Sequence, residues 1–209
     1  MKKTDIKIFV QTLKDTYPDA TCSLDFKTPF QLVVAVALSA QCTDERVNKT
    51  TPALFKRCQT IQDFADIDIK ELEEIIHPCG FNKNKAKNIK LCAKQVLENF
   101  NGVVPQTMDE LLTLAGIGRK SANVILLEVF GIASGIAVDT HAKRISNRIG
   151  LSSQKEPEKI EQDLLKIFPK ESLKDINHLF VWHGRNTCDS RKPRCENCTV
   201  KDFCKYYKS

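Results

Sequence analysis

The chain has 209 residues, 42% of them hydrophobic, and a formal net charge of +6. These totals exclude an intrinsically disordered chain, because enough apolar side chains are present to bury a core, and the length suits one large domain or two small ones. The longest uncharged apolar run, residues 32–40, has nine residues, whereas a membrane-spanning helix needs roughly 20. With no targeting segment expected at the N-terminus, the chain is predicted to act inside the cell, away from membranes.

The sequence predicts an all-α protein, since no stretch alternates as a strand would. Thr28, Pro29 and Gln31 form a capping-box pattern that begins a helix over 29–40, and this helix is apolar on every side, as a central buried helix would be. Further N-caps are expected at Thr43, Thr60, Asp68 and, in a second capping box with Glu110, Thr107. Longer helices are expected at about 83–99, 119–131, 140–149, 157–168 and 172–184.

The charges are segregated along the chain. Residues 82–95 hold five lysines and no acidic residue, residues 185–208 hold seven Lys or Arg against three acids, and residues 63–74 hold six acids against one lysine. Each run alone is most simply a solvated helix face. Together they favour an oriented surface whose basic side faces a polyanion.

Residues 114–127, LAGIGRKSANVILL, predict a tight joint between two helices. Gly116 and Gly118 permit positive φ angles and a close backbone approach, while Ile117 can pack between the helices. The backbone amides at the start of the second helix would then form an anion site, and Arg119 would face a phosphate. The alternative is an ordinary helix–turn–helix joint whose glycines serve packing only.

Lys120 is either a solvated charge, as a lysine at a helix start usually is, or a nucleophilic amine. An amine nucleophile must be unprotonated, and the helix dipole contributes only about 0.3–1 kcal/mol towards that. We therefore expect desolvation in a cleft to supply most of the effect. Asp139, in AVDTHAKR, is either the N-cap of the helix from Thr140 or a carboxylate directed at the same site as Lys120. The two interpretations of Asp139 are compatible.

The nine cysteines are unevenly distributed. Five are scattered, whereas four lie within 17 residues near the C-terminal end, at Cys188, Cys195, Cys198 and Cys204. The odd total and the tight group favour a metal site over a disulfide framework. The spacing alone is compatible with zinc or with an iron–sulfur cluster, although a zinc ribbon usually has two C-x2-C pairs and this chain has one.

The segments LAGIGRKSANVIL, AVDTH and CDSRKPRCENCTVKDFC resemble the endonuclease III family of DNA base-excision glycosylases. ALSAQCTD, GFNKNKAKNI, GVVP and FVWHGRNTC resemble the family's other characteristic segments in order and spacing. The resemblance implies an all-α, two-lobed helix-hairpin-helix glycosylase fold with a C-terminal iron–sulfur cluster loop at 188–204. One lobe, 22–133, would carry the hairpin among six helices, and the other would combine 1–21 with 134–209.

The family resemblance also implies a function. The protein would be a bifunctional DNA N-glycosylase and AP (apurinic/apyrimidinic) lyase that removes oxidised pyrimidines from damaged double-stranded DNA, after flipping the nucleotide out of the stack. Lys120 would attack the sugar C1′ and form a Schiff base, and β-elimination would follow with help from Asp139. A monomer in the cytoplasm is expected, associated with the nucleoid in a bacterium.

The remaining site residues follow from the same motifs. The resemblance implies DNA contacts by Gln41, Asp44, Phe81, Gly116, Ile117, Gly118, Arg119 and His141, and a 4Fe–4S cluster held by Cys188, Cys195, Cys198 and Cys204. The basic residues around this loop would contact phosphates. Two positions depart from the family pattern: Ala115 replaces a common proline, and Asn82 replaces a common tyrosine, which puts a stacking contact in doubt.

Two other functions remain open on the sequence. A monofunctional mismatch glycosylase acting on adenine or thymine has a similar pattern but lacks a lysine at the position of Lys120. A non-catalytic DNA-binding or redox-sensing iron–sulfur protein would need neither Lys120 nor Asp139.

Overall fold

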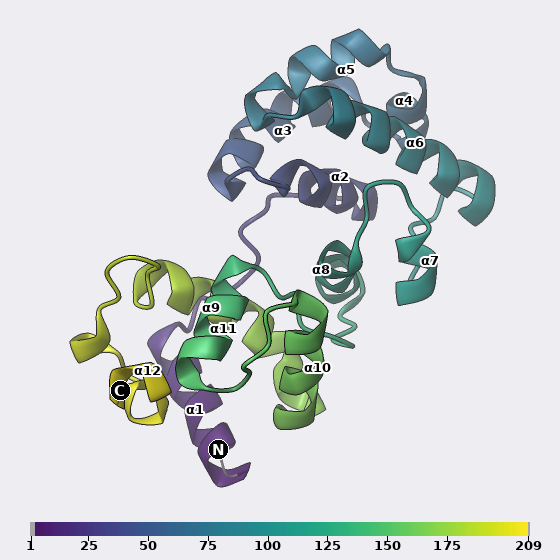
Figure 1. Cartoon of the computed structure of the whole chain (residues 1–209). Coiled ribbons are helices and arrows are strands. Elements are labelled where there is room, and N and C mark those ends of the chain that lie inside the picture. The colour runs from purple at the N-terminus through teal and green to yellow at the C-terminus, as the bar shows by residue number, and fades with distance from the viewer. Residues whose placement is uncertain (1–2, 209) are drawn as a thin grey trace. The chain divides into compact units, whose positions relative to one another are not determined.

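The computed structural model describes residues 3–208 and is helical throughout, with no strand in that range (Figure 1). The prediction of an all-α fold is confirmed. The chain divides into two compact units, Ser23–Phe130 and Met1–Cys22 with Gly131–Ser209. Residues 1, 2 and 209, which the expected second lobe includes, lie outside the described residues. No helix within 3–208 has the length and apolar character needed to cross a bilayer.

The unit Ser23–Phe130 is built around one apolar helix. α2 (Pro29–Ser39) buries side chains on all sides and packs against α3, α6 and α8, as its sequence predicts. The elements around it are α3 (Asp44–Arg57), α4 (Ile61–Asp66), α5 (Ile69–Ile75), the 3-10 helix η1 (His77–Cys79), α6 (Asn82–Phe100), α7 (Met108–Leu112) and α8 (Arg119–Phe130).

The other unit packs α1 (Lys3–Thr16) against α11 (Leu173–Asn186) around a phenylalanine core. The rings of Phe9, Phe168 and Phe180 lie with centroids 6.0–6.4 Å apart. The remaining elements are α9 (Thr140–Ile149), α10 (Pro157–Ile167), η2 (Lys170–Ser172), η3 (Cys195–Asn197), η4 (Lys201–Phe203) and α12 (Lys205–Lys208).

The expected N-caps are confirmed. The side chains of Thr28, Thr43, Thr60, Asp68, Thr107 and Asp139 each accept a hydrogen bond from a backbone amide of the first helical turn. The reciprocal bond of the first capping box differs from expectation, because the Gln31 side chain accepts from the amide of Lys27. The complete capping box lies instead at Thr60, where Asp63 occupies the third position.

Candidate functional site

The hairpin between α7 and α8 is shaped by one glycine. Gly116 has φ +79°, and a Cβ added there would lie 3.0 Å from the Cβ of Asn88 on α6. Ile117 is only 6% exposed, as expected for a side chain packed between the helices. Around Gly118, by contrast, an added Cβ would meet no atom within 4 Å. The turn is therefore packed against α6 on one side and open at Gly118.

A side chain of α6 braces the same turn. The Gln95 amide donates to the carbonyl of Thr113 at 3.1 Å and accepts from the backbone N–H of Ala115 at 2.7 Å. A proline at position 115 has no N–H, so it could not make the second bond. Ala115 therefore makes a hydrogen bond in the hairpin that the common proline could not make.

Lys120 is the second residue of α8 and its side chain is exposed, as is that of Arg119. The desolvation expected for Lys120 in a cleft is therefore not provided by Ser23–Phe130, where the side chain is exposed. Any desolvation of the Lys120 amine must come from outside this unit.

Gln41 and Phe81 share an unusual backbone conformation. Gln41 follows α2 with φ +54°, and Phe81 precedes α6 with φ +49°. Left-handed φ angles are uncommon in residues other than glycine and cost of order 1–3 kcal/mol where the surroundings enforce them. Both side chains are exposed, and Phe81, at 62%, is the most exposed large hydrophobic residue described. Such outliers with exposed side chains are typical of contact loops.

Two neighbours of these residues lie closer to the core. Asp44 is the first residue of α3 and is half-buried. Asn82 begins α6, and its side-chain amide donates to the carbonyl of Glu73 at 3.1 Å. Asn82 thus joins α6 to α5, and provides no ring for stacking.

Asp139 caps α9, in the other unit. Its carboxylate accepts from the amide of Ala142 at 2.8 Å and is half-buried. This bond fixes the direction of the carboxylate, so the capping interpretation is confirmed.

His141 is held in place by α11. Its Nδ1 lies 3.0 Å from a guanidinium nitrogen of Arg144, which also donates to the carbonyl of Gly184 at 2.9 Å. A Cβ on Gly184 would lie 2.5 Å from His141 Nδ1, so only glycine leaves room for this ring. Burial lowers the pKa of His141, with Asp139 opposing and Arg144 and Arg185 reinforcing the shift. The ring is therefore kept neutral beside two guanidinium groups.

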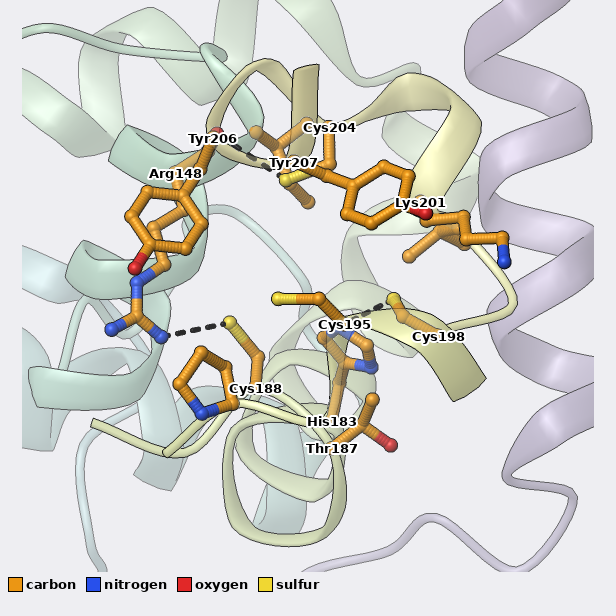
Figure 2. Close-up of a pocket in the computed structure, with 13 residues that line it drawn as sticks. Arg148, His183, Thr187, Cys188, Cys195, Cys198, Lys201, Cys204, Tyr206 and Tyr207 are labelled. Carbon is orange, nitrogen blue, oxygen red and sulfur yellow. Dashed lines mark hydrogen bonds between the residues drawn. The ribbon is translucent and has the colours of Figure 1, made fainter. Parts of the chain in front are cut away.

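The four clustered cysteines line one pocket. Cys188, Cys195, Cys198 and Cys204 are all free thiols, each half-buried, and all point into the space shown in Figure 2. Burial raises the pKa of Cys198, and the other three cysteines raise it further. Thiolates are good ligands for cationic groups, so four thiols that line one space fit a metal-containing group.

The chemistry of these thiols suits a metal-containing group. Among the residues that the structure describes, no three His, Cys, Asp or Glu side chains converge closely enough to hold one metal ion. A tetrahedral zinc with Zn–S bonds of about 2.3 Å would need its sulfurs roughly 3.8 Å apart. Four thiolates are also the usual ligand set of a 4Fe–4S cluster, so by their chemistry the thiols fit either group.

Arg148 and His183 line the same pocket. The Arg148 guanidinium donates to the carbonyls of Asp189 and Ser190 and lies 3.3 Å from the sulfur of Cys188. Burial lowers the pKa of His183 to about 4, so this ring is neutral. It lies between the Tyr17 hydroxyl, at 3.0 Å, and the Cys198 sulfur, at 3.8 Å. Hydrogen-bond donors near the sulfurs are a feature of cluster sites.

Several of these positioning residues are absent from the sequence-based predictions. Gln95, Arg144, Arg148 and Gly184 act through contacts with residues distant along the chain. One signal was present, because a glycine inside a predicted helix, as in WHGRN, often marks a close approach. The glutamine and the arginines carry no such local signal.

Comparison with known proteins supplies the family. The family described as HhH-GPD superfamily base excision DNA repair protein matches residues 34–170. Endonuclease III of Synechocystis sp. is 52% identical over 192 residues, covering 92% of this chain and 88% of that protein. A non-covalent endonuclease III–DNA complex superimposes with a TM-score of 0.94 at 38% identity, over 100% of this chain and 97% of that one. A trapped endonuclease III–DNA covalent intermediate superimposes with the same TM-score of 0.94, at 38% identity, over 100% of this chain and 98% of that one.

Proposed function

This chain belongs to the endonuclease III family of the HhH-GPD superfamily, and from that membership we propose that it is a bifunctional DNA N-glycosylase and AP lyase. It removes oxidised pyrimidines from damaged duplex DNA in base-excision repair, inside the cell and as a monomer. The observation that carries the proposal is a lysine, Lys120, at the helix start after the Gly-Ile-Gly turn, in a chain superimposable on an enzyme trapped covalently on DNA.

The nucleophile we assign is the Lys120 amine. It attacks C1′ of the damaged nucleotide, and the bond to the base breaks with its electron pair leaving on the base, which is then protonated. The amine nitrogen then loses a proton and the C1′–O4′ bond opens, with its electron pair going to O4′, which is protonated, to give the imine. The imine acidifies C2′, so a base removes a C2′ proton and the C3′–O bond breaks with its electron pair leaving on the 3′-phosphate, which cuts the strand. Because Lys120 is exposed, its amine is open to approach by the sugar of a bound nucleotide.

Asp139 assists the same steps. Its carboxylate stabilises the positive charge that develops on the sugar and helps to move protons. The bond from the amide of Ala142 orients this carboxylate, so it needs no rearrangement when the charge develops.

DNA is bound by backbone and side-chain groups of both units. The start of α8, with Arg119, binds a phosphate, and the open space at Gly118 permits close approach of the strand. Gln41 and Phe81 enter the duplex around the flipped nucleotide, with Asp44 beside them. His141 contacts the strand, and the exposed basic residues near the cysteine loop contact phosphates. Binding is therefore expected to weaken steeply with salt.

Cys188, Cys195, Cys198 and Cys204 would hold a 4Fe–4S cluster. Cysteine thiolates are the usual ligands of such a cluster, and these four line one pocket. When bound, the cluster would cross-link the loop 188–204, since hydrolysis and elimination transfer no electron. The Arg148 guanidinium donates to the carbonyls of Asp189 and Ser190 and to the sulfur of Cys188, and so orders the first residues of the loop.

The test is borohydride trapping on a duplex with one thymine glycol. Wild type should become covalently attached to DNA, and Lys120→Ala should not, because no imine can form. Lys70→Ala, an exposed lysine of the acidic segment, is the matched control and should trap like wild type. Base release without any adduct would instead indicate a monofunctional glycosylase. Neither release nor adduct would leave a DNA-binding protein and refute the proposal.

A further inference from the structure

A buried lysine joins the two loops that carry Gln41 and Phe81. Lys85, in the first turns of α6, is only 7% exposed, and its Nζ donates to the carbonyls of Leu38 and Cys79, each at 2.8 Å. Leu38 lies three residues before Gln41, and Cys79 two residues before Phe81. One ammonium group thus binds the stems of both loops.

The bond to Leu38 completes a helix end. α2 has no basic residue in its last turn, and the amide of Cys42 bonds to Ser39 rather than to Leu38. The last carbonyls of a helix lack intrahelical partners and carry a partial negative charge. Lys85 therefore supplies from α6 the cation that α2 does not have.

Burying the charged ammonium of Lys85 costs free energy, and the direction of its pKa shift reflects that cost. Burial lowers the pKa of Lys85, and the nearby thiols of Cys42 and Cys79 oppose the shift. No carboxylate is recorded as its partner among the described residues; its two recorded bonds go to backbone carbonyls. A leucine or methionine would fill such a position without this cost. The retained charge points to a requirement for the two bonds.

The strained backbone at Gln41 and Phe81 explains why the two hydrogen bonds of Lys85 are needed. Left-handed conformations at Gln41 and Phe81 persist only where the surroundings over-determine them. Gln41 lies just beyond the helix end that Lys85 caps, and Phe81 just beyond the 3-10 helix η1 that Lys85 also binds. The same group can thus fix both outliers relative to each other.

We propose that Lys85 is a positioning residue that holds the loops of Gln41 and Phe81 in the geometry needed to enter duplex DNA. This inference rests on the proposed function, which assigns Gln41 and Phe81 to insertion around the flipped nucleotide. Lys85 itself contacts neither the reacting sugar nor the base. Its effect should appear in duplex distortion and leave the amine chemistry of Lys120 largely intact.

The chain offers a close control in Lys90. This lysine is five residues further along α6, and its Nζ donates to the carbonyls of Ala65 and Ile67 at the end of α4, a helix that also lacks a basic residue in its last turn. Lys85→Met and Lys90→Met therefore remove the same kind of interaction from the same helix. Only the first removes it from the loops of Gln41 and Phe81.

The experiment compares wild type and both variants on two DNAs. The first is a duplex with one thymine glycol and 2-aminopurine opposite it, whose fluorescence reports base flipping. The second is a single-stranded oligonucleotide with one abasic site, which needs no insertion, and adducts are counted after borohydride. Lys85→Met should flip and release base roughly ten- to a hundredfold more slowly on the duplex. Its single-strand trapping should stay within about threefold of wild type, and Lys90→Met should resemble wild type on both DNAs.

A double-mutant cycle tests the route of the effect. In a Phe81→Ala background, Lys85→Met should cost less duplex activity than in wild type, because one of the two positioned side chains is already gone. If Lys85→Met does not fold, Lys85→Gln, which keeps a neutral donor, serves in its place.

The outcomes separate the inference from the proposed function. Equal losses for Lys85→Met on both DNAs, equal duplex losses for Lys85→Met and Lys90→Met, or additive losses in the cycle would each overturn the role of Lys85. Wild type that fails to trap on either DNA would overturn the lyase function, and this inference with it.

Discussion

The two helix starts that carry the proposed catalytic residues are built in different ways. The hairpin before α8 is made by residues close along the chain, with Gln95 only 20 positions from Ala115. The start of α9 depends on distant residues, since Arg144 reaches Gly184 and Cys188, 40 and 44 positions away. Lys120 is therefore presented by a locally determined turn, whereas the surroundings of Asp139 and His141 depend on α11 and the cysteine loop.

The largest expected effect is on the start of α9, which depends on residues distant along the chain. Replacing Cys204 with serine to prevent cluster loading should release the loop 188–204, and with it the carbonyls that Arg144 and Arg148 bind. Hydrogen exchange should then show protection falling by about a hundredfold or more in the loop and less steeply at 139–144. Residues 114–120 should keep their protection.

The control for this loss is Cys22→Ser, at a half-buried cysteine outside the pocket, which should leave exchange unchanged. A uniform loss of protection across both units would contradict the separation between the hairpin and the start of α9.

Gly184→Ala should disrupt the start of α9 more selectively. The added Cβ would lie 2.5 Å from His141 Nδ1, and crowding of this kind typically costs about 1–3 kcal/mol. Urea unfolding measures the loss. Adding His141→Ala should restore part of it, because the displaced ring is then absent; strictly additive losses would show that the two residues do not conflict.

The hairpin offers a paired test of the local arrangement. Gly116→Ala should destabilise the fold by about 1–3 kcal/mol, because φ is +79° and the new Cβ meets Asn88. Gly118→Ala should change stability by no more than about 0.5 kcal/mol, since its surroundings are open. Duplex binding at low salt should weaken for Gly118→Ala if the DNA strand approaches there. Thermal unfolding measures both changes in stability, and equal losses for Gly116→Ala and Gly118→Ala would refute the packing argument.

The smallest effect is a pH dependence at His141. Burial lowers the pKa of the folded His141, against the influence of Asp139, so the unfolded chain binds a proton first as the pH falls. The contribution to stability is complete above about pH 6.5 and is lost as the pH falls below it, by at most about 1.4 kcal/mol per pH unit. The free energy of unfolding, measured from pH 7.5 to 5, should depend less on pH in His141→Gln than in wild type. Parallel curves for the two proteins would contradict a neutral, half-buried ring.

The sequence predicted features that depend on neighbours along the chain. Thr28, Thr43 and Asp139 were recognised as caps because a cap and its amide lie within one turn. The cysteine loop was recognisable from its spacing. Helix α1 was missed, although Ile6, Phe9, Val10 and Leu13 follow helical spacing and are buried.

The features of the site that could not be predicted from the sequence are contacts between residues distant along the chain. Lys85 belongs to a run of lysines that read as a solvated face, yet it is buried against two carbonyls. The strained backbone at Phe81 could not be foreseen, because nothing in the local residues favours a left-handed phenylalanine. Lys120 is exposed, and the desolvation expected for its amine stays a prediction, because a requirement of the chemistry does not identify the group that excludes water.

The hydrogen bond between Gln95 and Ala115 makes the effect of a substitution at position 115 depend on the residue at position 95. Proline at 115 would stiffen the turn but leave the Gln95 carbonyl oxygen without the amide that it now accepts from. Alanine at 115 gives up that stiffness and gains the bond. Neither choice can be judged without knowing the residue at 95, so these positions are expected to vary together across the family, and a proline transplanted here without a change at 95 is expected to bring little benefit.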